Sequence, residues 1–245
     1  MARIFITGSA DGLGQLTAKL LVDQGHQVVL HARNAARGRD ALNKVKGGAE
    51  EVLVGDLSSM DETKKLAAEV NALGAFDAVI HNAGVYRVPS KLIFAVNTLA
   101  PYILTILIQK PKRLIYIGSG MHLHGHPNLA NFTKDISRIS YSDSKLHVLM
   151  LAMAVARKWQ EVCSNAVDPG WVPTKMGGRG APDNLQRGYE TQVWLAVSND
   201  EQARVTGCYF HHKREARYNP EATDVTLQER FLKTCEEITG VSFPQ

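Results

Sequence analysis

Tyr141 and Lys145 are the residues of this chain whose types and spacing most clearly permit acid–base chemistry. They lie four positions apart at the start of an apolar helical pattern, and side chains with that spacing share a helix face. An ammonium beside a phenol favours the phenolate and so lowers a pKa that is ordinarily near 10. The pair is therefore a candidate proton donor and acceptor at neutral pH. A lone Tyr-x-x-x-Lys is usually an ordinary exposed pair, so the assignment depends on the rest of the chain.

A glycine-rich turn follows the first apolar segment. Residues 3–7 predict a buried strand, residues 8–14 read Gly-Ser-Ala-Asp-Gly-Leu-Gly, and a helical pattern comes next. Gly8 permits a tight turn, Gly12 lets a phosphate approach the backbone, and Gly14 lets the helix pack close to the strand. The amino terminus of the helix then faces a pyrophosphate. A plain surface turn is the alternative, but the strand–turn–helix order favours a dinucleotide site.

The spacing of this turn resembles that of the short-chain dehydrogenase/reductase family, and further family motifs follow in order along nearly the whole chain. They are Asn82-Ala83-Gly84, Ser119 after an apolar strand, Tyr141-x-x-x-Lys145, and Pro169-Gly170 with Thr174. The 22 positions from Ser119 to Tyr141 and the closing helical segment resemble the retinol-dehydrogenase-like branch. One such motif is weak, whereas the ordered set is specific.

The resemblance implies reversible hydride transfer between a nicotinamide and a carbonyl or alcohol. Tyr141 would give the proton to the forming alkoxide, or take it in the reverse direction. Ser119 would hold the substrate oxygen, and Lys145 would favour the phenolate and bind the nicotinamide ribose. Asn97 lies inside a helical segment and would keep a water that links Lys145 to solvent. A solvated position on the helix face is the alternative for Asn97.

The ends of the predicted strands carry the other cofactor contacts that the resemblance implies. Asp56 would bind the adenine amino group and could also cap the next helix. Asn82 and Gly84 would support the sheet first and line the cofactor second. The Pro-Gly segment would cover the nicotinamide, with Val172 and Thr174 reaching its carboxamide. The predicted cofactor set is Gly8, Ser9, Ala10, Asp11, Gly12, Leu13, Gly14, His31, Arg33, Asn34, Asp56, Leu57, Asn82, Ala83, Gly84, Tyr141, Lys145, Pro169, Gly170, Val172 and Thr174.

The end of the second predicted strand, residues 27–31, bears on cofactor choice. A carboxylate at this point would bind the ribose 2′-hydroxyl of NAD, but the chain has Ala32 and Arg33. Arginine can bind a 2′-phosphate bidentately, with His31 and Asn34 assisting, so NADP(H) is favoured. NAD(H) stays open, because Asp11 occupies a glycine-turn position where NADP-preferring relatives often carry a basic residue.

Alternating strand and helix patterns predict an α/β fold, a single Rossmann-type doubly wound parallel sheet of about seven strands with helices on both faces. One NAD(P)-binding domain covers residues 1–245. The expected strands are 3–7, 27–31, 52–54, 78–80, 112–118, 162–167 and 207–210, and the later helices are 141–159, 185–197 and 225–238. Loops near 120–140 and 171–190 border the substrate, the Gly-rich part 175–182 as a mobile lid, and 211–217 reads as a solvated connection.

His122, His124 and His126 alternate in the first of these loops and would line one side of an extended segment. Three histidines tempt a metal assignment. Because no Cys, Asp or Glu lies close by in the sequence to complete a site, we predict no metal and interpret the set as a polar, substrate-facing loop.

The composition of the chain disfavours several classes of binding partner. The chain has 245 residues, 44% hydrophobic and 21% charged, with a net charge of only +4 and scattered basic residues, which disfavours nucleic acid. The three cysteines are odd in number and form no CxxC pair, as expected in a reducing compartment. The opening Met-Ala-Arg leaves no room for a signal peptide, and the apolar stretch 99–108, broken by Pro101, is too short to span a membrane. A cytoplasmic enzyme without a membrane partner is expected.

Two alternatives differ in class from this enzyme. One is a non-catalytic NADP(H)-binding sensor or scaffold with the same fold, which the joint presence of Ser119, Tyr141 and Lys145 disfavours. The other is a sugar-nucleotide epimerase or dehydratase, for which the chain lacks a separate substrate domain. A homo-oligomer is possible. The short segment between Asn82 and Asn97 and the short helix after it put the usual family dimer interface in question.

Overall fold

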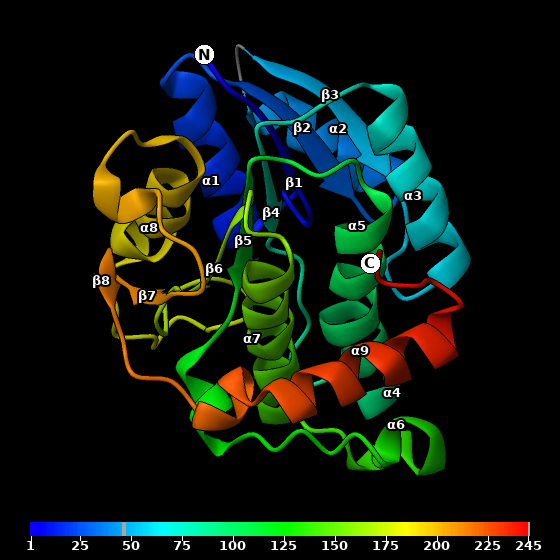
Figure 1. Ribbon diagram of the computed structural model, residues 1–245. Helices are drawn as coiled ribbons and strands as arrows, with labels where there is room; N and C mark the ends of the chain where they lie inside the picture. Colours follow the sequence, from blue (N-terminus) through cyan, green and yellow to red (C-terminus); the bar gives the residue numbers. More distant parts are fainter. Residues whose placement is uncertain (46–47, 245) are drawn as a thin grey trace.

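A central sheet of eight strands organises the computed structural model, which describes residues 1–45 and 48–244 (Figure 1). The strand order is β3-β2-β1-β4-β5-β6-β7-β8, with every pair from β3 to β7 parallel and β8 antiparallel to β7. The strands are β1 (Arg3–Ile6), β2 (Gln27–Ala32), β3 (Ala49–Val54), β4 (Ala78–His81), β5 (Arg113–Ile117), β6 (Cys163–Asp168), β7 (Tyr209–His211) and β8 (Arg214–Glu215). The doubly wound parallel sheet is confirmed. Its order reverses between β1 and β4, where such sheets bind ligands at the carboxyl ends of their strands.

Helices cover both faces, and the strand alternation explains why. Phe5 of β1 enters one apolar cluster, whereas its neighbours Ile4 and Ile6 enter another on the opposite face. The face of Ile4 and Ile6 carries α1 (Gly12–Asp23), α2 (Ala35–Lys44) and α8 (Leu185–Val197). The opposite face carries α3 (Met60–Ala72), α5 (Ala100–Leu107) and α7 (Tyr141–Lys158), with α9 (Val225–Thr239) packed on α7 (Figure 1).

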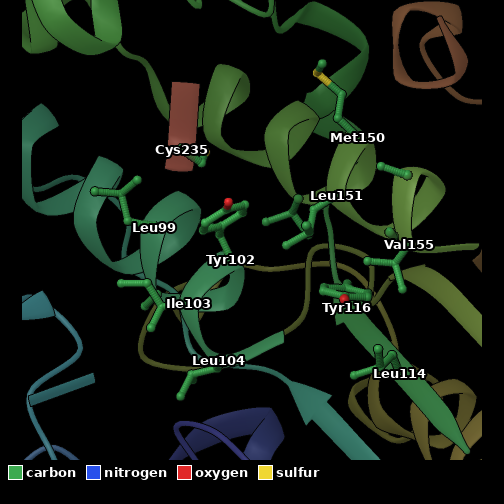
Figure 2. Close-up of a cluster of buried hydrophobic side chains, with 14 of the residues drawn as sticks. Leu99, Tyr102, Ile103, Leu104, Leu114, Tyr116, Met150, Leu151, Val155 and Cys235 are labelled. Atoms are coloured by element: carbon green, nitrogen blue, oxygen red, sulfur yellow. The ribbon is translucent and has the colours of Figure 1, made fainter. Parts of the chain in front are cut away.

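The core under α5, α7 and β5 fixes the helix that carries the tyrosine. Tyr102 of α5 is fully buried and donates a hydrogen bond to the Val241 carbonyl, 2.8 Å away. Figure 2 shows Tyr102 on one side of this cluster and Tyr116 of β5 on the other, with Leu151 of α7 between them. Burying aromatic and branched side chains of this size contributes about 1.5–3 kcal/mol each. The amino terminus of α7 is thereby held at the carboxyl edge of the sheet.

Among residues 1–45 and 48–244, one apolar helical stretch, Ser90–Leu107, is long and apolar enough to cross a membrane by length and composition. It comprises α4 (Ser90–Ile93), a π-helical segment (Phe94–Leu99) and α5. In the fold, 67% of this stretch is buried, and α5 packs against α3. This is the burial expected of a core helix.

Two sequence expectations are wrong. Residues 211–217 are not a plain connection, because β7 turns at His212 and Lys213 and returns as β8. The three-histidine loop is not extended, since Gly120–His124 forms a 3₁₀ helix that buries His122 and leaves His124 exposed. The remaining short elements are α6 (Asn131–Lys134) and the 3₁₀ turns Ile136–Arg138, Glu201–Ala203 and Pro220–Thr223.

Candidate active site

The glycine turn between β1 and α1 has the geometry that its sequence predicts. Gly8 has a φ of +64°, and a β-carbon there would lie 2.9 Å from Ala83 Cα. A β-carbon on Gly14 would lie 2.3 Å from Asn82 Nδ2 and 2.7 Å from the Gly8 carbonyl oxygen. Such distances are far below van der Waals contact, so these positions require glycine. The close approach at Gly14 joins α1 directly to the turn and to the end of β4.

Thr7 and Asn82 bind the turn to the strand beside it. The Asn82 side-chain amide donates to the carbonyl oxygens of Thr7 (3.0 Å) and Gly8 (3.2 Å). The Thr7 hydroxyl accepts from the amides of Asn82 and Ala83, both at 3.0 Å. Asn82 therefore supports the sheet, as expected. Thr7 shares this role, which sequence reasoning did not assign to it.

His31 braces the turn from the other side. Its ring is 2% exposed, Nδ1 accepts from the Gly8 amide at 2.9 Å, and Nε2 lies 2.9 Å from the Gly55 carbonyl oxygen. Burial lowers the pKa of His31, which keeps the ring neutral and able to accept at one nitrogen while it donates at the other. The Ser9 hydroxyl oxygen accepts a further hydrogen bond from the His31 amide. His31 thus holds the loop in shape with both ring nitrogens engaged.

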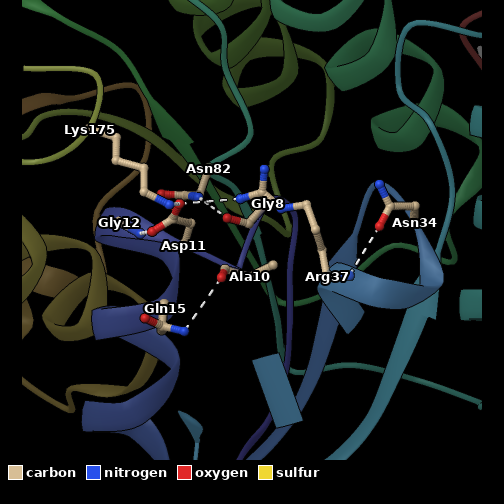
Figure 3. Close-up of polar contacts among 9 residues, drawn as sticks. All are labelled: Gly8, Ala10, Asp11, Gly12, Gln15, Asn34, Arg37, Asn82 and Lys175. Atoms are coloured by element: carbon tan, nitrogen blue, oxygen red, sulfur yellow. Dashed lines mark hydrogen bonds and ion pairs between the residues drawn. The ribbon is translucent and has the colours of Figure 1, made fainter. Parts of the chain in front are cut away.

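Asp11 joins three elements at the mouth of the turn (Figure 3). Its Oδ1 accepts from the Gly12 amide at 2.9 Å and caps α1. Its Oδ2 lies 2.5 Å from Lys175 Nζ and 3.3 Å from Arg37 Nη2. Burial raises the pKa of Asp11, but the Lys175 ammonium, the Gly12 amide and Arg37 together hold it below its ordinary value. Arg37 and Lys175 were not predicted, since their sequence positions carry no motif.

The other predicted adenosine-side residues lie at the ends of β2 and β3. Arg33 is exposed. Asn34 accepts from the Arg37 amide at 3.0 Å and caps α2. Asp56 accepts from the amide and hydroxyl of Ser58 in a local turn, and Leu57 beside it is buried. The cap of α3 is Ser59 rather than Asp56, so the capping alternative for Asp56 is wrong.

A capping box places Tyr141 at the first position of α7. Ser140 accepts from the Asp143 amide at 3.1 Å, and Asp143 accepts in return from the Ser140 amide at 2.9 Å. The Asp143 carboxylate is 3% exposed and also binds the His126 amide (2.7 Å) and the Asn128 side chain (3.0 Å). These amides lower the pKa of Asp143 although burial opposes them. One carboxylate thus fixes both the start of α7 and the loop before it.

The expectation that Lys145 lowers the pKa of Tyr141 is wrong. Burial raises the pKa of Tyr141 to about 12, and this outweighs the lowering by the Ser119 side chain. The ring of Tyr86 lies 4.6 Å from that of Tyr141, and Tyr86 and Asp168 raise the pKa further. Lys145 Nζ is 5.5 Å from the Tyr141 ring centre. The phenol is therefore protonated at neutral pH.

Lys145 lies 5% exposed beneath the site. Its Nζ donates to the Ile117 carbonyl oxygen at 2.8 Å. Burial lowers the pKa of Lys145 to about 8, although the Asp168 carboxylate acts in the opposite direction. A β-carbon on Gly84 would lie 3.5 Å from Lys145 Nζ and 3.6 Å from Asn97 Oδ1. Lys145 Nζ and Asn97 Oδ1 therefore both lie within van der Waals distance of the place that a side chain at position 84 would take.

Asn97 is 1% exposed and lies in the π-helical segment, so the solvated-face alternative is wrong. Its Oδ1 accepts from the Val85 amide at 2.8 Å, and its Nδ2 donates to the Val85 carbonyl (3.0 Å) and to Ser144 Oγ (3.1 Å). The side chain ties the loop after β4 to α7. A π-helical turn is frequent at functional sites because it displaces one residue from the regular helix.

Ser119 follows β5 and lies against Tyr141. Its hydroxyl oxygen accepts from the Met121 amide at 3.2 Å and caps the 3₁₀ helix. The His122 ring turns inward, with Nδ1 2.7 Å from the Ser119 carbonyl oxygen. Asp168 Oδ2 approaches from β6 and would lie 3.0 Å from a β-carbon on Gly120. Asp168 stands directly before the Pro-Gly segment and was not predicted as a site residue.

The Pro-Gly segment leads from β6 into the Gly-rich residues 175–182. Pro169 and Val172 are buried, and the Gly170 amide donates to Asp168 Oδ1 at 2.9 Å. Thr174 accepts through its hydroxyl from the Gly177 amide at 3.2 Å, and its side chain would lie 3.9 Å from a β-carbon on Gly12. A cavity of about 450 Å³ is lined by Pro173, Thr174, Lys175, Gly178 and Arg179. Residues 174–175 and the glycine turn therefore lie side by side.

These residues converge on one edge of the sheet. The glycine turn, Asn82 to Gly84, Ser119, Tyr141 with Lys145, and the Pro-Gly segment all stand at carboxyl ends of β1, β4, β5 and β6 or at the helix beside them. Among residues 1–45 and 48–244, no group of three His, Cys, Asp or Glu could hold a metal ion.

Comparison with known structures shows the same fold. A structure of an uncharacterized protein from Mycobacterium paratuberculosis superimposes with a TM-score of 0.84 at 22% identity, covering 100% of this chain and 96% of the other. A structure from Shigella flexneri described as a short chain dehydrogenase complexed with NADP gives a TM-score of 0.70 at 20% identity, over 87% of this chain and 97% of the other.

Comparison of sequences gives closer relatives. A family model described as short chain dehydrogenase matches residues 2–105. An uncharacterized oxidoreductase of Emericella nidulans is 48% identical, over 100% of this chain and 99% of its own length. A short-chain dehydrogenase of Penicillium rubens is 44% identical over 100% of both chains. Retinol dehydrogenase 14 of Mus musculus is 26% identical, over 97% of this chain and 86% of its own length. The chain therefore belongs to the short-chain dehydrogenase family, as its ordered motifs predict.

Proposed function

We propose that this protein is an NADP(H)-dependent oxidoreductase that interconverts a carbonyl and an alcohol, with Tyr141 as the general acid and base. The observation that carries the proposal is the juxtaposition of Tyr141, the Ser119 side chain and a buried Lys145 at the carboxyl edge of the sheet. A phenol and a hydroxyl that meet beside an open strand end can share one substrate oxygen.

The protonation states suit carbonyl reduction. With a pKa of about 12, the Tyr141 phenol keeps its proton at neutral pH and can give it to a forming alkoxide. Ser119 holds the same oxygen by hydrogen bonding. Lys145, with a pKa of about 8, is charged below that pH and can donate hydrogen bonds to a cofactor bound beside Tyr141. Asn97 and Gly84 border the space through which Lys145 would regain contact with water.

The residues present fit a dinucleotide cofactor, which supplies the hydride when bound. The turn at Gly8 and Gly12 presents backbone without side chains, and α1 begins at this turn, so the helix amino terminus faces an incoming phosphate. Gly8 to Gly14 would hold the pyrophosphate, and Asp56 and Leu57 the adenine. Lys145 would hold the nicotinamide ribose, and Val172 and Thr174 the carboxamide.

Three cationic residues, Arg33, Arg37 and Lys175, support NADP(H) over NAD(H). Arg33 is exposed at the end of β2, and Arg37 lies one helical turn further on and contacts Asp11. The objection from Asp11 is weakened, because Lys175 and Arg37 already balance its carboxylate. The NADP complex of the Shigella flexneri protein is consistent with this choice.

The test is a screen of carbonyls with NADPH and NADH, and of alcohols with NADP⁺ and NAD⁺, with Tyr141→Phe as the paired variant. We expect turnover with NADPH or NADP⁺, and a loss of about 10²–10⁴-fold in Tyr141→Phe, while NADPH still quenches or shifts protein fluorescence in both proteins. Full activity of Tyr141→Phe would refute the catalytic role. Tight NADPH binding without turnover on the whole panel would favour a sensor instead.

We also propose a single domain in a cytoplasmic protein that does not form the usual family dimer through α5 and α7. The three cysteines are free, which suits a reducing compartment. The carboxyl-terminal segment covers these helices from within the chain, since α9 packs on α7 and Trp159 stacks near Phe243, with ring centres 5.1 Å apart. Light scattering at two protein concentrations tests the assembly.

A further inference from the structure

A cavity of about 410 Å³ lies between α8 and the β7–β8 hairpin, which stand side by side in Figure 1. It shares no lining residue with the cavity between Pro173 and Arg179. It lies beyond Asp168, whose backbone carbonyl oxygen is 3.2 Å from His211 Nδ1. The residues that line it are Arg187, Glu190 and Thr191 of α8 and His211, His212, Lys213 and Arg214 of the hairpin. Neither the hydride transfer nor the cofactor contacts use any of them.

The lining is strongly cationic. Arg187, Lys213 and Arg214 carry fixed positive charge, two imidazoles lie beside them, and Glu190 is the single carboxylate. Within the part of the chain that the structure describes, none of the three cations forms an ion pair. Unneutralised cations that face a concave surface attract anions.

Nearby acids offset part of this charge without pairing with the three cations. Asp168 Oδ2 lies 3.6 Å from His211 Nδ1 and so faces one imidazole of the lining. Asp168 Oδ1 accepts from the Gly170 amide at 2.9 Å, and Asp183 Oδ2 accepts from the Trp171 amide at 2.5 Å. Glu190 Oε1 accepts from the Gln186 side chain at 2.5 Å. The guanidinium and ammonium groups of the lining therefore keep their donors for a ligand.

The turn of the hairpin is held in an unfavourable backbone conformation. His212 and Lys213 have φ values of 50° and 62°, as a two-residue type I′ turn requires, where Asn and Gly are the favoured residues. Two successive non-glycine residues in the left-handed region are unfavourable. The Lys213 amide donates to Thr191 Oγ1 at 3.1 Å and fixes the turn against α8. The turn thus holds two basic side chains at a fixed place on the cavity wall.

His212 contributes a polar atom that has no partner. Its Nε2 is buried and makes no hydrogen bond within residues 1–45 and 48–244, and the His211 ring lies 3.8 Å away. Burial, His211 and Arg187 lower the pKa of His212. A buried imidazole nitrogen without a partner is destabilising, and an anion in the cavity would give it a partner.

We propose that the cavity between α8 and the β7–β8 hairpin binds a small oxyanion, the phosphate or carboxylate group of a ligand, through Arg187, Lys213, Arg214 and His212. Arginine provides a fork of donors that matches either group. The site goes beyond the proposed hydride transfer. The anion has two sources, the acid group of a carbonyl substrate that also reaches Ser119, or a separate small molecule.

The first experiment locates the site without any turnover. Inorganic phosphate is titrated into the ¹⁵N-labelled protein while the imidazole resonances of His211 and His212 are followed. We expect both to shift in the wild type, and Arg187→Gln to need about tenfold more phosphate, as for the loss of one charge-assisted hydrogen bond. Arg230→Gln, which removes an exposed charge on α9, is the control and should titrate as the wild type does.

Phosphate that moves neither resonance, or Arg187→Gln that binds as the wild type does, overturns the proposal. Because this readout needs no catalysis, an inactive protein that binds phosphate here would refute the proposed function alone.

The second experiment separates the two sources. The KM for a keto acid is compared with that for its methyl ester in the wild type and in Arg187→Gln. If the acid is the better substrate and Arg187→Gln removes about tenfold of that advantage, the anion belongs to the substrate. If the ratio stays constant while phosphate binding weakens, a separate anion occupies the site. Either result supports an oxyanion site.

Discussion

The two halves of the sheet handle buried polar groups in opposite ways. Around the glycine turn, both ring nitrogens of His31 are engaged with backbone, and so are the amide of Asn82 and the hydroxyl of Thr7. Around Tyr141, Asp143 and Asn97 have hydrogen bonds at both polar side-chain atoms, but two further buried groups are poorly compensated. Lys145 has one hydrogen bond, and Tyr209 has a buried hydroxyl without a partner in the described residues.

This difference distinguishes the residues that fix the shape of the glycine turn from those proposed to transfer a proton. Neutral groups that saturate their hydrogen bonds make a rigid loop whose shape is set before any ligand arrives. Ionisable groups that are buried without full compensation have shifted pKa values and reduce stability, which is the usual condition of a site that moves protons. A substitution that adds a side-chain atom at the glycine turn should therefore destabilise the fold. A substitution that removes a buried charge near Tyr141 should instead stabilise it.

The largest effect is expected from Gly14→Ala. A β-carbon would lie 2.3 Å from Asn82 Nδ2, so the variant must displace the Asn82 brace and should lose about 3 kcal/mol of unfolding free energy together with NADPH binding. Gly180→Ala, where a β-carbon meets nothing within 4 Å, is the control for urea denaturation. Equal stability of the two variants would contradict the rigid-loop interpretation.

Lys145→Met should lower turnover about 10²-fold and yet stabilise the fold by roughly 2–3 kcal/mol at pH 7. Folding lowers the pKa of Lys145 from 10.5 to about 8, so the unfolded chain binds the proton more tightly and wild-type stability is reduced below pH 8. Wild-type stability should recover between pH 8 and about 10.5, so that the gap to the variant closes. Lys233→Met, an exposed change on α9, should show no such closing. A Lys145→Met variant that is less stable than the wild type would contradict the conclusion that the buried charge of Lys145 destabilises the fold.

Arg33→Gln should reduce the preference for NADPH over NADH about tenfold, which is the contribution of one charge-assisted contact to a phosphate. Arg37→Gln should act in the same direction, because Arg37 lies beside the turn and contacts Asp11. Arg39→Gln on the same helix, also exposed, is the control. Unchanged ratios of KM for the two cofactors in both variants would exclude 2′-phosphate recognition by these arginines.

The smallest effect concerns Asp143→Asn, with an expected loss of about 1 kcal/mol. The Asp143 carboxylate has a lowered pKa, so its stabilising effect is present above the ordinary carboxyl pKa and is lost as the pH falls through the folded value. Thermal unfolding between pH 7 and pH 3 should show a shallower acid dependence in the variant. Asp61→Asn, exposed on α3, serves as the matched change, and the same acid dependence in both variants would argue against this role.

The sequence was sufficient for elements whose signals are local. Strand runs, the glycine turn and the helix 185–197 depend on periodicity and on residues close in the chain, and α8 spans those residues in the structure. The Ser140-x-x-Asp143 pattern is also a local signal, a capping box that could have been recognised. Family resemblance placed Asn97 in a helix, and the structure adds the π-helical turn around it.

The contacts that could not be predicted from the sequence join residues that are far apart in the chain. Asp11 and Lys175 are separated by 164 positions, so no spacing predicts their ion pair. The pKa of Tyr141 is set by burial under Tyr86 and the loop rather than by Lys145. His31 looked like a cofactor contact because it ends a strand, but the glycine turn folds onto its ring.

The helix α9 has a consequence for how the enzyme responds to dilution. It lies on α7 within the same chain, and Tyr102 of α5 bonds to the carbonyl groups of Leu232 and Val241 at its end. A cover that belongs to the chain follows first-order folding, whereas one supplied by a second subunit obeys mass action. The region around Tyr141 should therefore keep its stability at low protein concentrations where a subunit-dependent enzyme would lose it.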